Sequence, residues 1–224
     1  MKNRLTRPFG RAFAIICVAG CLAVAGIVAA AAAEPKLGDL GSVLNQLRQG
    51  GFVIYFRHAA TERTGANDEA ADLEKCETQR ALSDIGRAQA VQIGEGMKRL
   101  RIPIGQVISS PFCRCKDTAT LAFGRVTVDK GLYFALVPNP EEVKRLAAST
   151  RKMLSTARAP APGTNTVLVS HTANLREAAG IWPKHEGMAY VFRPLGDGKF
   201  EPVAMIMPED WSKVASSQAS AGVN

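Results

Sequence analysis

Short apolar runs alternate with amphipathic segments along most of the chain. Four runs are rich in β-branched and aromatic residues and have the length of strands, namely residues 52–56, 106–109, 125–128 and 166–169. The segments between them have the apolar spacing of helices, at residues 40–49, from Ser83 to Ile102-Pro103, at residues 112–122 and after Asn139. This alternation predicts an α/β protein, a three-layer α/β/α sandwich with a mostly parallel central sheet.

Particular residues predict where these elements begin and end. Ser83 and Asn139 suit helix N-caps, Pro140 suits N1, and Pro111 suits the start of the helix at 112–122. We expect the Ser83 helix to bury a face made of Ile85, Ala88, Val91, Ile93 and Met97. Gly196-Asp197-Gly198 predicts a hairpin turn between residues 189–192 and 203–207. The Ser/Ala-rich residues 213–224 predict a disordered tail.

Residues 1–33 have the pattern of an export signal. Four cations precede an almost wholly apolar stretch at residues 12–30, and Ala31-Ala32-Ala33 offers small residues for cleavage before Glu34. Two alternatives stay open: the apolar stretch remains as a membrane anchor, or Cys21 is lipidated. We expect cleavage, a periplasmic or secreted protein, and one folded domain at residues 34–212, with membrane contact only if the segment is retained.

Charge and cysteine content narrow the class of protein further. The formal net charge is +8, and it falls to +4 without Lys2, Arg4, Arg7 and Arg11 of the export signal. No basic cluster is interleaved with aromatic residues, so no nucleic-acid partner is expected. Cys113 and Cys115 lie two apart on one helix and face different directions. Cys76 therefore pairs with one of them, and we favour Cys113. No second cluster of metal ligands accompanies the cysteines, so no metal is expected.

Residues that can bind an anion follow three of the four strands. Arg57-His58 follows residues 52–56, Ser109-Ser110-Pro111 ends the second strand with Arg114 just beyond it, and Ser170-His171 ends the fourth. The carboxyl ends of parallel strands meet at one sheet edge, where α/β proteins bind their ligands. Burial of arginine requires an anionic partner, and its planar fork binds tetrahedral oxyanions bidentately. The pattern predicts a phosphate-binding pocket. A long polar loop at residues 61–79 leads away from it.

These segments resemble the histidine phosphatase superfamily, in particular its phosphoglycerate mutase-like branch. Arg57-His58-Ala59-Ala60-Thr61 is similar to the Arg-His-Gly-x-Thr signature, with Ala59 in place of glycine. Residues 107–119 are similar to the Ser-x-Arg-x-x-x-Thr-Ala segment, residues 168–171 to the second histidine segment, and residues 81–90 to the helix that joins the first two. The resemblance covers residues 50–207 and implies a phosphoglycerate mutase-like fold.

The resemblance also implies a role for each matching residue. His58 is the expected nucleophile, which becomes a phosphohistidine. Arg57, Arg114 and His171 are expected to hold the phosphoryl oxygens, and Thr61 to contact substrate. Neither a metal nor another cofactor is required. The residues themselves support one point independently, because two flanking guanidinium groups disfavour protonation of His58, and only the neutral ring can attack.

The proton donor for the leaving oxygen is less well defined. In the phosphoglycerate mutase branch a glutamate after the third strand serves, which implies Glu141, or else Glu142. Both have structural explanations, since Glu142 occupies the capping-box position of the helix capped by Asn139 and Glu141 suits its first turn. In the acid phosphatase branch an acidic residue follows the second histidine, where this chain has Thr172. The remaining candidates lie in the long loop: Glu62 and Asp72.

Three further residues lie near the expected pocket. His185 and Glu186 share a loop, in which Glu186 can face the pocket mouth and touch substrate while His185 is a surface residue. Arg80 can reach a phosphate, although a solvated arginine is the simpler account.

We therefore expect an exported phosphomonoesterase that acts on a phosphorylated small molecule, by analogy a sugar phosphate of the cell envelope. One alternative is a mutase that moves phosphate within its substrate, against which export argues. The other is a non-catalytic binder of phosphorylated envelope components. A redox protein is not favoured, because Cys113 and Cys115 do not form a Cys-x-x-Cys motif.

Overall fold

The computed structural model describes residues 37–63, 71–156 and 162–221. The expected export signal, residues 1–33, lies outside these ranges. A six-stranded sheet forms the centre of the described chain, in the order β3-β2-β4-β1-β5-β6. The strands are β1 (Val53–Arg57), β2 (Ile104–Ser109), β3 (Thr127–Val128), β4 (Asn165–Ser170), β5 (Ala189–Gly196) and β6 (Lys199–Ile206). Strands β1 to β4 are parallel. Strands β5 and β6 form the predicted hairpin, in which β5 runs antiparallel to both β1 and β6.

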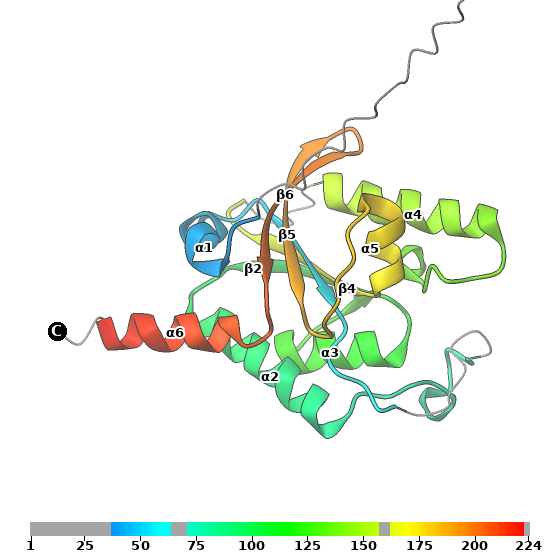
Figure 1. Ribbon diagram of the computed structural model, residues 1–224, viewed down its shortest axis with the longest axis horizontal. Coiled ribbons are helices and arrows are strands. Elements are labelled where there is room, and N and C mark those ends of the chain that lie inside the picture. The colour runs from blue at the N-terminus through cyan, green and yellow to red at the C-terminus, as the bar shows by residue number, and fades with distance from the viewer. Residues whose placement is uncertain (1–36, 64–70, 157–161, 222–224) are drawn as a thin grey trace, which may run out of the picture. The chain divides into compact units, whose positions relative to one another are not determined.

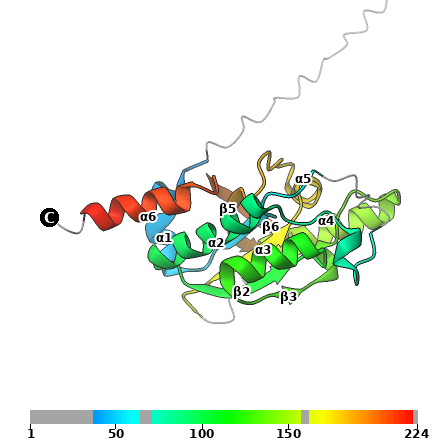
Figure 2. The same ribbon diagram turned by 90° about the horizontal axis from the view of Figure 1, so that it is seen from below.

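Helices cover both faces of this sheet, which confirms the predicted α/β sandwich. They are α1 (Leu40–Gln49), α2 (Asp84–Arg99), α3 (Cys113–Phe123), α4 (Pro140–Ser155), α5 (Thr172–Ala179) and α6 (Asp210–Ala221), with short 3-10 helices at Cys76–Thr78 and Lys130–Leu132. Helices α1, α2, α3 and α6 share one hydrophobic core with the sheet, and α4 and α5 pack on its other face (Figure 1). Figure 2 shows α2 and α3 running beside each other, with the short strand β3 next to β2.

The N-caps confirm two of the three predicted helix starts. The side chain of Ser83 accepts a hydrogen bond from Gly86 N, and that of Asn139 accepts one from Glu141 N. The third helix begins later than predicted, because Phe112 keeps an extended backbone and α3 starts at Cys113. Pro111 therefore lies before the cap and not at the first helical position.

Helix α2 buries a different face from the predicted one. Ile85 is 75% exposed and Val91 38% exposed, whereas Gly86, Ala90 and Gly96 are buried together with the expected Ile93 and Met97. Gly86 and Gly96 explain why the buried face of α2 is rotated from the predicted one. A Cβ atom on Gly86 would lie 1.8 Å from the carbonyl oxygen of Ala60, and one on Gly96 would lie 2.8 Å from Trp211. The helix thus packs by its backbone against other chain segments, which a pattern of large apolar residues does not predict.

The predicted disordered tail is wrong for most of its length, because residues 210–221 form α6. Trp211 anchors this helix: its side chain is fully buried and its ring centroid lies 5.9 Å from that of Phe56 on β1. Ala215 is buried one turn later. The remainder of the predicted tail, residues 222–224, lies outside the described ranges.

The cysteines pair as predicted. A disulfide joins Cys76 to Cys113, and Cys115 is a buried thiol. The disulfide connects the long loop after β1 to the first residue of α3. Of the helices within the described ranges, none has the length and apolarity needed to span a membrane.

Candidate active site

Strands β1, β2 and β4 end level with one another, and the residues that follow them meet at one edge of the sheet. The backbone N–H of His58 donates to Ser170 O at 3.0 Å, and that of Ser110 donates to Val169 O at 2.9 Å. Both bonds continue the strand alignment past the strand ends. The ring centroids of His58 and His171 are consequently 5.6 Å apart. The structure brings the two histidines together, as the sequence leads one to expect.

His58 is buried and oriented by its own backbone neighbour. Its side chain is 3% exposed, and its Nδ1 lies 2.9 Å from the carbonyl oxygen of Ala59. Because a carbonyl oxygen only accepts, Nδ1 carries the proton and the lone pair is on Nε2. Burial lowers the pKa of His58 well below its usual value, and the charges of Arg114 and Arg57 lower it further. The ring is therefore neutral and nucleophilic at Nε2, and burial is a larger cause than the two guanidinium groups.

Arg114 and His171 form a buried pair beside His58. Arg114, the second residue of α3, is fully buried, and its Nη2 donates to Nδ1 of His171 at 3.2 Å. Nε2 of His171 carries the ring proton and donates to Ser110 Oγ at 2.8 Å. The guanidinium carbon of Arg114 also lies 4.6 Å from the ring centroid of Phe112. Burial, followed by the charge of Arg114, lowers the pKa of His171 well below its usual value.

Arg57 holds the loop that precedes β5 against His58. Its Nη1 donates to the carbonyl oxygens of Pro183 at 3.2 Å and Lys184 at 2.8 Å. The backbone N–H of Gly187 donates to His58 O at 2.8 Å, so the loop is attached to His58 itself. This arrangement results from the sheet order, because β5 is the neighbour of β1 and its preceding loop must pass the end of that strand.

Glu186 is the carboxylate that this loop brings to His58. Its Oε1 accepts from Thr61 Oγ1 at 2.8 Å, lies 3.4 Å from Arg57 Nη2, and lies 3.9 Å from Nδ1 of His58. Its Oε2 accepts from the backbone N–H of Thr61 at 3.2 Å. Sequence reasoning gave Glu186 a place at the pocket mouth but did not consider it as a proton donor. No local signal in the sequence indicates its place beside His58, because that place depends on the pairing of β5 with β1.

The four expected donor carboxylates, Glu62, Asp72, Glu141 and Glu142, are placed differently. The side chain of Glu141 is 79% exposed at the start of α4 and pairs with Lys144 at 2.8 Å. Glu142 forms two hydrogen bonds with Arg145, which lower the pKa of its carboxyl group. Among the side-chain contacts of the described residues, none joins these four carboxylates to His58, Arg114 or His171.

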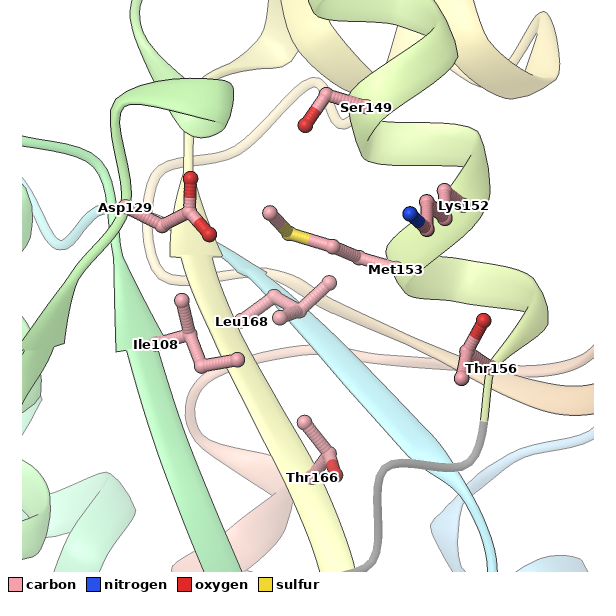
Figure 3. A pocket seen from close by; sticks show the side chains of 8 residues that line it. All are labelled: Ile108, Asp129, Ser149, Lys152, Met153, Thr156, Thr166 and Leu168. Carbon is pink, nitrogen blue, oxygen red and sulfur yellow. The ribbon is translucent and has the colours of Figure 1, made fainter.

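An open cavity of about 350 Å³ lies at the outer end of this site, and we call it the mouth cavity. Its lining includes Arg57, Thr61, Arg63, Arg80, Lys184 and Glu186. A more enclosed cavity of about 150 Å³ lies elsewhere, between α4 and strands β2 and β4 (Figure 3). Its lining combines Asp129 and Lys152 with Met153 and strand side chains, and includes neither a histidine nor an arginine. The chemistry of phosphate binding therefore favours the mouth cavity.

The described residues contain no group of three or more His, Cys, Asp or Glu side chains placed to hold a metal ion. Beside one another in this site lie the guanidinium groups of Arg57 and Arg114 and the neutral rings of His58 and His171, a set of groups suited to bind a phosphoryl group.

Comparison with known proteins agrees with this fold. Residues 53–133 match the model of the histidine phosphatase superfamily (branch 1). No curated protein matches the sequence.

Three solved structures are similar in fold. The protein histidine phosphatase SixA complexed with tungstate has a TM-score of 0.50 and 15% identity, over 71% of this chain and 98% of that one. The Rv3214 protein from Mycobacterium tuberculosis has a TM-score of 0.50 and 19% identity, over 69% and 96%. Phosphoserine phosphatase from Entamoeba histolytica, in complex with 3-phosphoglyceric acid, has a TM-score of 0.52 and 16% identity, over 69% and 95%. At these identities the similarity shows the fold, which is the phosphoglycerate mutase-like fold expected from the sequence.

Proposed function

We propose that this protein is an exported phosphomonoesterase that works through a phosphohistidine on His58. The observation that supports this most directly is the hydrogen bond from Nδ1 of His58 to Ala59 O, in a ring kept neutral by burial. It leaves Nε2 as the nucleophilic atom beside two guanidinium groups. The match of residues 53–133 to the histidine phosphatase superfamily fits this chemistry.

In the first step Nε2 of His58 attacks phosphorus, and the bond from phosphorus to the ester oxygen breaks. Arg57, Arg114 and His171 bind the other phosphoryl oxygens, whose charge must be balanced during the transfer. The pair of Arg114 and His171 is already ordered by their mutual hydrogen bond and by Ser110. Little reorganisation is then needed when the phosphoryl group arrives.

The leaving oxygen needs a proton, and we propose Glu186 as its source in place of Glu141. Glu186 lines the mouth cavity, through which the leaving group departs, and its carboxylate is fixed by Thr61 and Arg57. Glu141 has an exposed carboxylate that pairs with Lys144. Protonation by a carboxyl group so placed contributes about 10²- to 10⁴-fold to such reactions.

In the second step water attacks the phosphohistidine and the bond from phosphorus to Nε2 breaks. Glu186, now ionised, accepts a proton from this water, so the enzyme returns to its starting state and inorganic phosphate leaves. Thr61 holds the carboxylate in one position through both steps.

The likeness to the superfamily supports a phosphorylated small molecule as substrate. One similar structure is named a phosphoserine phosphatase, and another is named a protein histidine phosphatase. For this chain, the pattern of residues 1–33 and the disulfide between Cys76 and Cys113 favour a periplasmic or secreted location. A phosphorylated sugar of the envelope would be encountered there.

Phosphate release from a panel of phosphomonoesters, by residues 34–224 and by its His58→Ala variant, tests this proposal. We expect release by the parent alone. Turnover that survives in His58→Ala would overturn the mechanism. Transfer of phosphate within the substrate, without release to water, would instead identify a mutase, and phosphate binding without any phosphohistidine would identify a non-catalytic binder.

A further inference from the structure

The carboxylate of Glu186 is held beside His58 by the backbone on either side of it. Thr61 donates to both of its oxygens, from its N–H at 3.2 Å and from its Oγ1 at 2.8 Å. Gly187, the residue that follows Glu186, donates its N–H to His58 O at 2.8 Å. The position of the carboxylate therefore depends on what fixes Gly187 and on what fixes Ala60, the residue before Thr61.

One side chain of helix α2 contacts both of these residues. Oε1 of Gln89 accepts from the backbone N–H of Ala60 at 3.0 Å. A Cβ atom on Gly187 would lie 2.5 Å from the same oxygen and 2.6 Å from Cδ, so the amide group of Gln89 lies directly against the Cα atom of this glycine. Gly187 has a φ of 79°, a conformation that favours glycine. The amide of Gln89 thus lies between the two backbone segments that hold Glu186.

Helix α2 gives this side chain a rigid support. Ser83, the N-cap of the helix, donates its backbone N–H to Ala60 O at 3.1 Å, and a Cβ atom on Gly86 would lie 1.8 Å from the same oxygen. Helix α2 therefore holds Ala60 by its carbonyl oxygen and, through Gln89, by its N–H. Groups supported on helices and strands hold a site more precisely than groups supported on loops alone.

His58 is held by other parts of the fold. Its backbone N–H donates to Ser170 O at 3.0 Å, at the end of β4, and the N–H of Ala59 donates to Thr118 Oγ1 on α3 at 3.0 Å. Both of these contacts remain when the side chain of Gln89 is removed. Its loss should therefore displace the carboxylate of Glu186 more than the ring of His58.

From this arrangement we infer that Gln89 is a positioning residue, which sets the place of the Glu186 carboxylate relative to His58 through the backbone on either side of Glu186. The inference rests on the proposed function, because Glu186 is taken there as the proton donor. Gln89 itself needs no contact with substrate for this role. A displacement of about 1 Å in a catalytic group can cost on the order of 10²-fold in rate, so the step that needs a proton should depend on Gln89.

The dependence of Gln89→Ala on the leaving group tests this role. We expect kcat/KM for an alkyl phosphate to fall at least about tenfold, and kcat/KM for p-nitrophenyl phosphate, whose leaving group needs no proton, to fall less than about twofold. Gln92→Ala is the matched control, because Gln92 is exposed on the same helix, and it should leave both values unchanged. Where Glu186→Gln discriminates between the two esters, equal losses on both in Gln89→Ala, or no loss on either, would overturn the inference.

A double variant shows whether the two residues act together. Because Gln89 acts through Glu186, the Gln89→Ala, Glu186→Gln double variant should lose no more kcat/KM for the alkyl phosphate than Glu186→Gln alone. A loss equal to the product of the two separate losses would mean that Gln89 acts independently of Glu186, and it would overturn the inference.

Hydrogen exchange measured by NMR gives a readout that does not depend on activity. The amide of Gly187, which donates to His58 O, should exchange at least about tenfold faster in Gln89→Ala than in the parent. Its rate is taken relative to the amides of the central strand β4, which report unfolding of the whole fold. Gln92→Ala should exchange like the parent, and an unchanged relative rate in Gln89→Ala would overturn the inference.

The two kinds of measurement separate this inference from the proposed function. If Gly187 exchanges faster in Gln89→Ala but the parent hydrolyses neither ester, or Glu186→Gln does not discriminate between them, the positioning role of Gln89 stands and the proposed function of Glu186 fails. If Glu186→Gln discriminates between the esters and Gln89→Ala does not, the proposed function stands and the role of Gln89 fails.

Discussion

Nδ1 of His58 lies 2.9 Å from the carbonyl oxygen of Ala59, the residue that replaces glycine in the family signature. On the side of residue 59 the contact uses only the backbone carbonyl group, so alanine in place of glycine preserves it. Ala59 is fully buried, and its N–H donates to Thr118 Oγ1 at 3.0 Å. Among the described residues other than glycine, positive φ angles occur at Arg101 and Asp197 and not at Ala59. The substitution therefore leaves the orientation of the nucleophile intact.

The two buried histidines make the folded protein sensitive to acid. Because the pKa values of His58 and His171 lie well below the unfolded value of about 6.5, the unfolded chain binds more protons in that interval. Their contribution to stability is complete above about pH 6.5 and is lost as the pH falls below it. Each histidine adds about 1.4 kcal/mol per pH unit to the slope.

Urea unfolding from pH 7.5 to pH 5 measures this slope. We expect the His58→Gln variant to lose stability less steeply than the parent, by about 1.4 kcal/mol per pH unit. Protonation of carboxylates is common to both proteins and cancels in the difference. Parallel curves would show that His58 is not held neutral by the fold.

Replacement of Glu186 should affect poor leaving groups most. In Glu186→Gln the amide still accepts from Thr61 but cannot donate a carboxyl proton. We expect kcat/KM for an alkyl phosphate, which reports the step that releases the leaving group, to fall about 100-fold, and kcat/KM for p-nitrophenyl phosphate, whose leaving group needs no proton, to fall far less.

Glu141→Gln is the matched control, because it removes the carboxylate that the family resemblance implies as the proton donor. Its side chain is exposed and pairs with Lys144, so we expect less than a twofold change on either ester. A large loss in Glu141→Gln together with a small one in Glu186→Gln would reverse the assignment.

Gly86 couples helix α2 to the nucleophile loop. A Cβ atom there would lie 1.8 Å from Ala60 O, two residues beyond His58, whereas one on Gly94 would lie 1.9 Å from Ala122 O at the end of α3. Gly86→Ala and Gly94→Ala should both destabilise the fold, by about 1–3 kcal/mol for overpacking. We expect only Gly86→Ala to lower kcat/KM by more than about tenfold when both are assayed well below their melting temperatures. Equal activities would show that this contact does not position His58.

The disulfide stabilises the long loop and the start of α3. It closes a loop with a sequence separation of 37, for which chain entropy gives about 2–4 kcal/mol of stability. The Cys76→Ala, Cys113→Ala double variant should lose this amount in urea unfolding. It should also lose kcat/KM, because Cys113 directly precedes Arg114. Cys115→Ala keeps the disulfide and serves as the comparison, and equal stability of the double variant and the parent would contradict the account.

Much of this site could be predicted because it depends on local signals. The apolar run before Arg57-His58 and the runs before Ser110 and His171 define strand ends, and parallel strands bring such ends together whatever the loops do. The place of Glu186 beside His58 could not be found this way. Glu186 reaches His58 only because β5 pairs antiparallel with β1, a long-range choice that strand patterns do not reveal.

The wrong predictions about the buried face of α2 and about the C-terminal tail have the same origin. The buried face of α2 depends on Gly86 and Gly96, which lie too close to Ala60 and Trp211 for a side chain to fit. The fate of the C-terminal tail depends on whether Trp211 finds a place in the core, next to Phe56. Both depend on the packed structure and not on the local pattern of residues.

The most direct test of the central claim is to trap the phosphorylated enzyme. The parent protein is mixed with substrate, quenched in alkali within milliseconds, digested and analysed by mass spectrometry. We expect one acid-labile, alkali-stable phosphate per chain on His58, and none in His58→Gln. Turnover with no phosphate on His58 at any time, or with phosphate on another residue, would contradict the account.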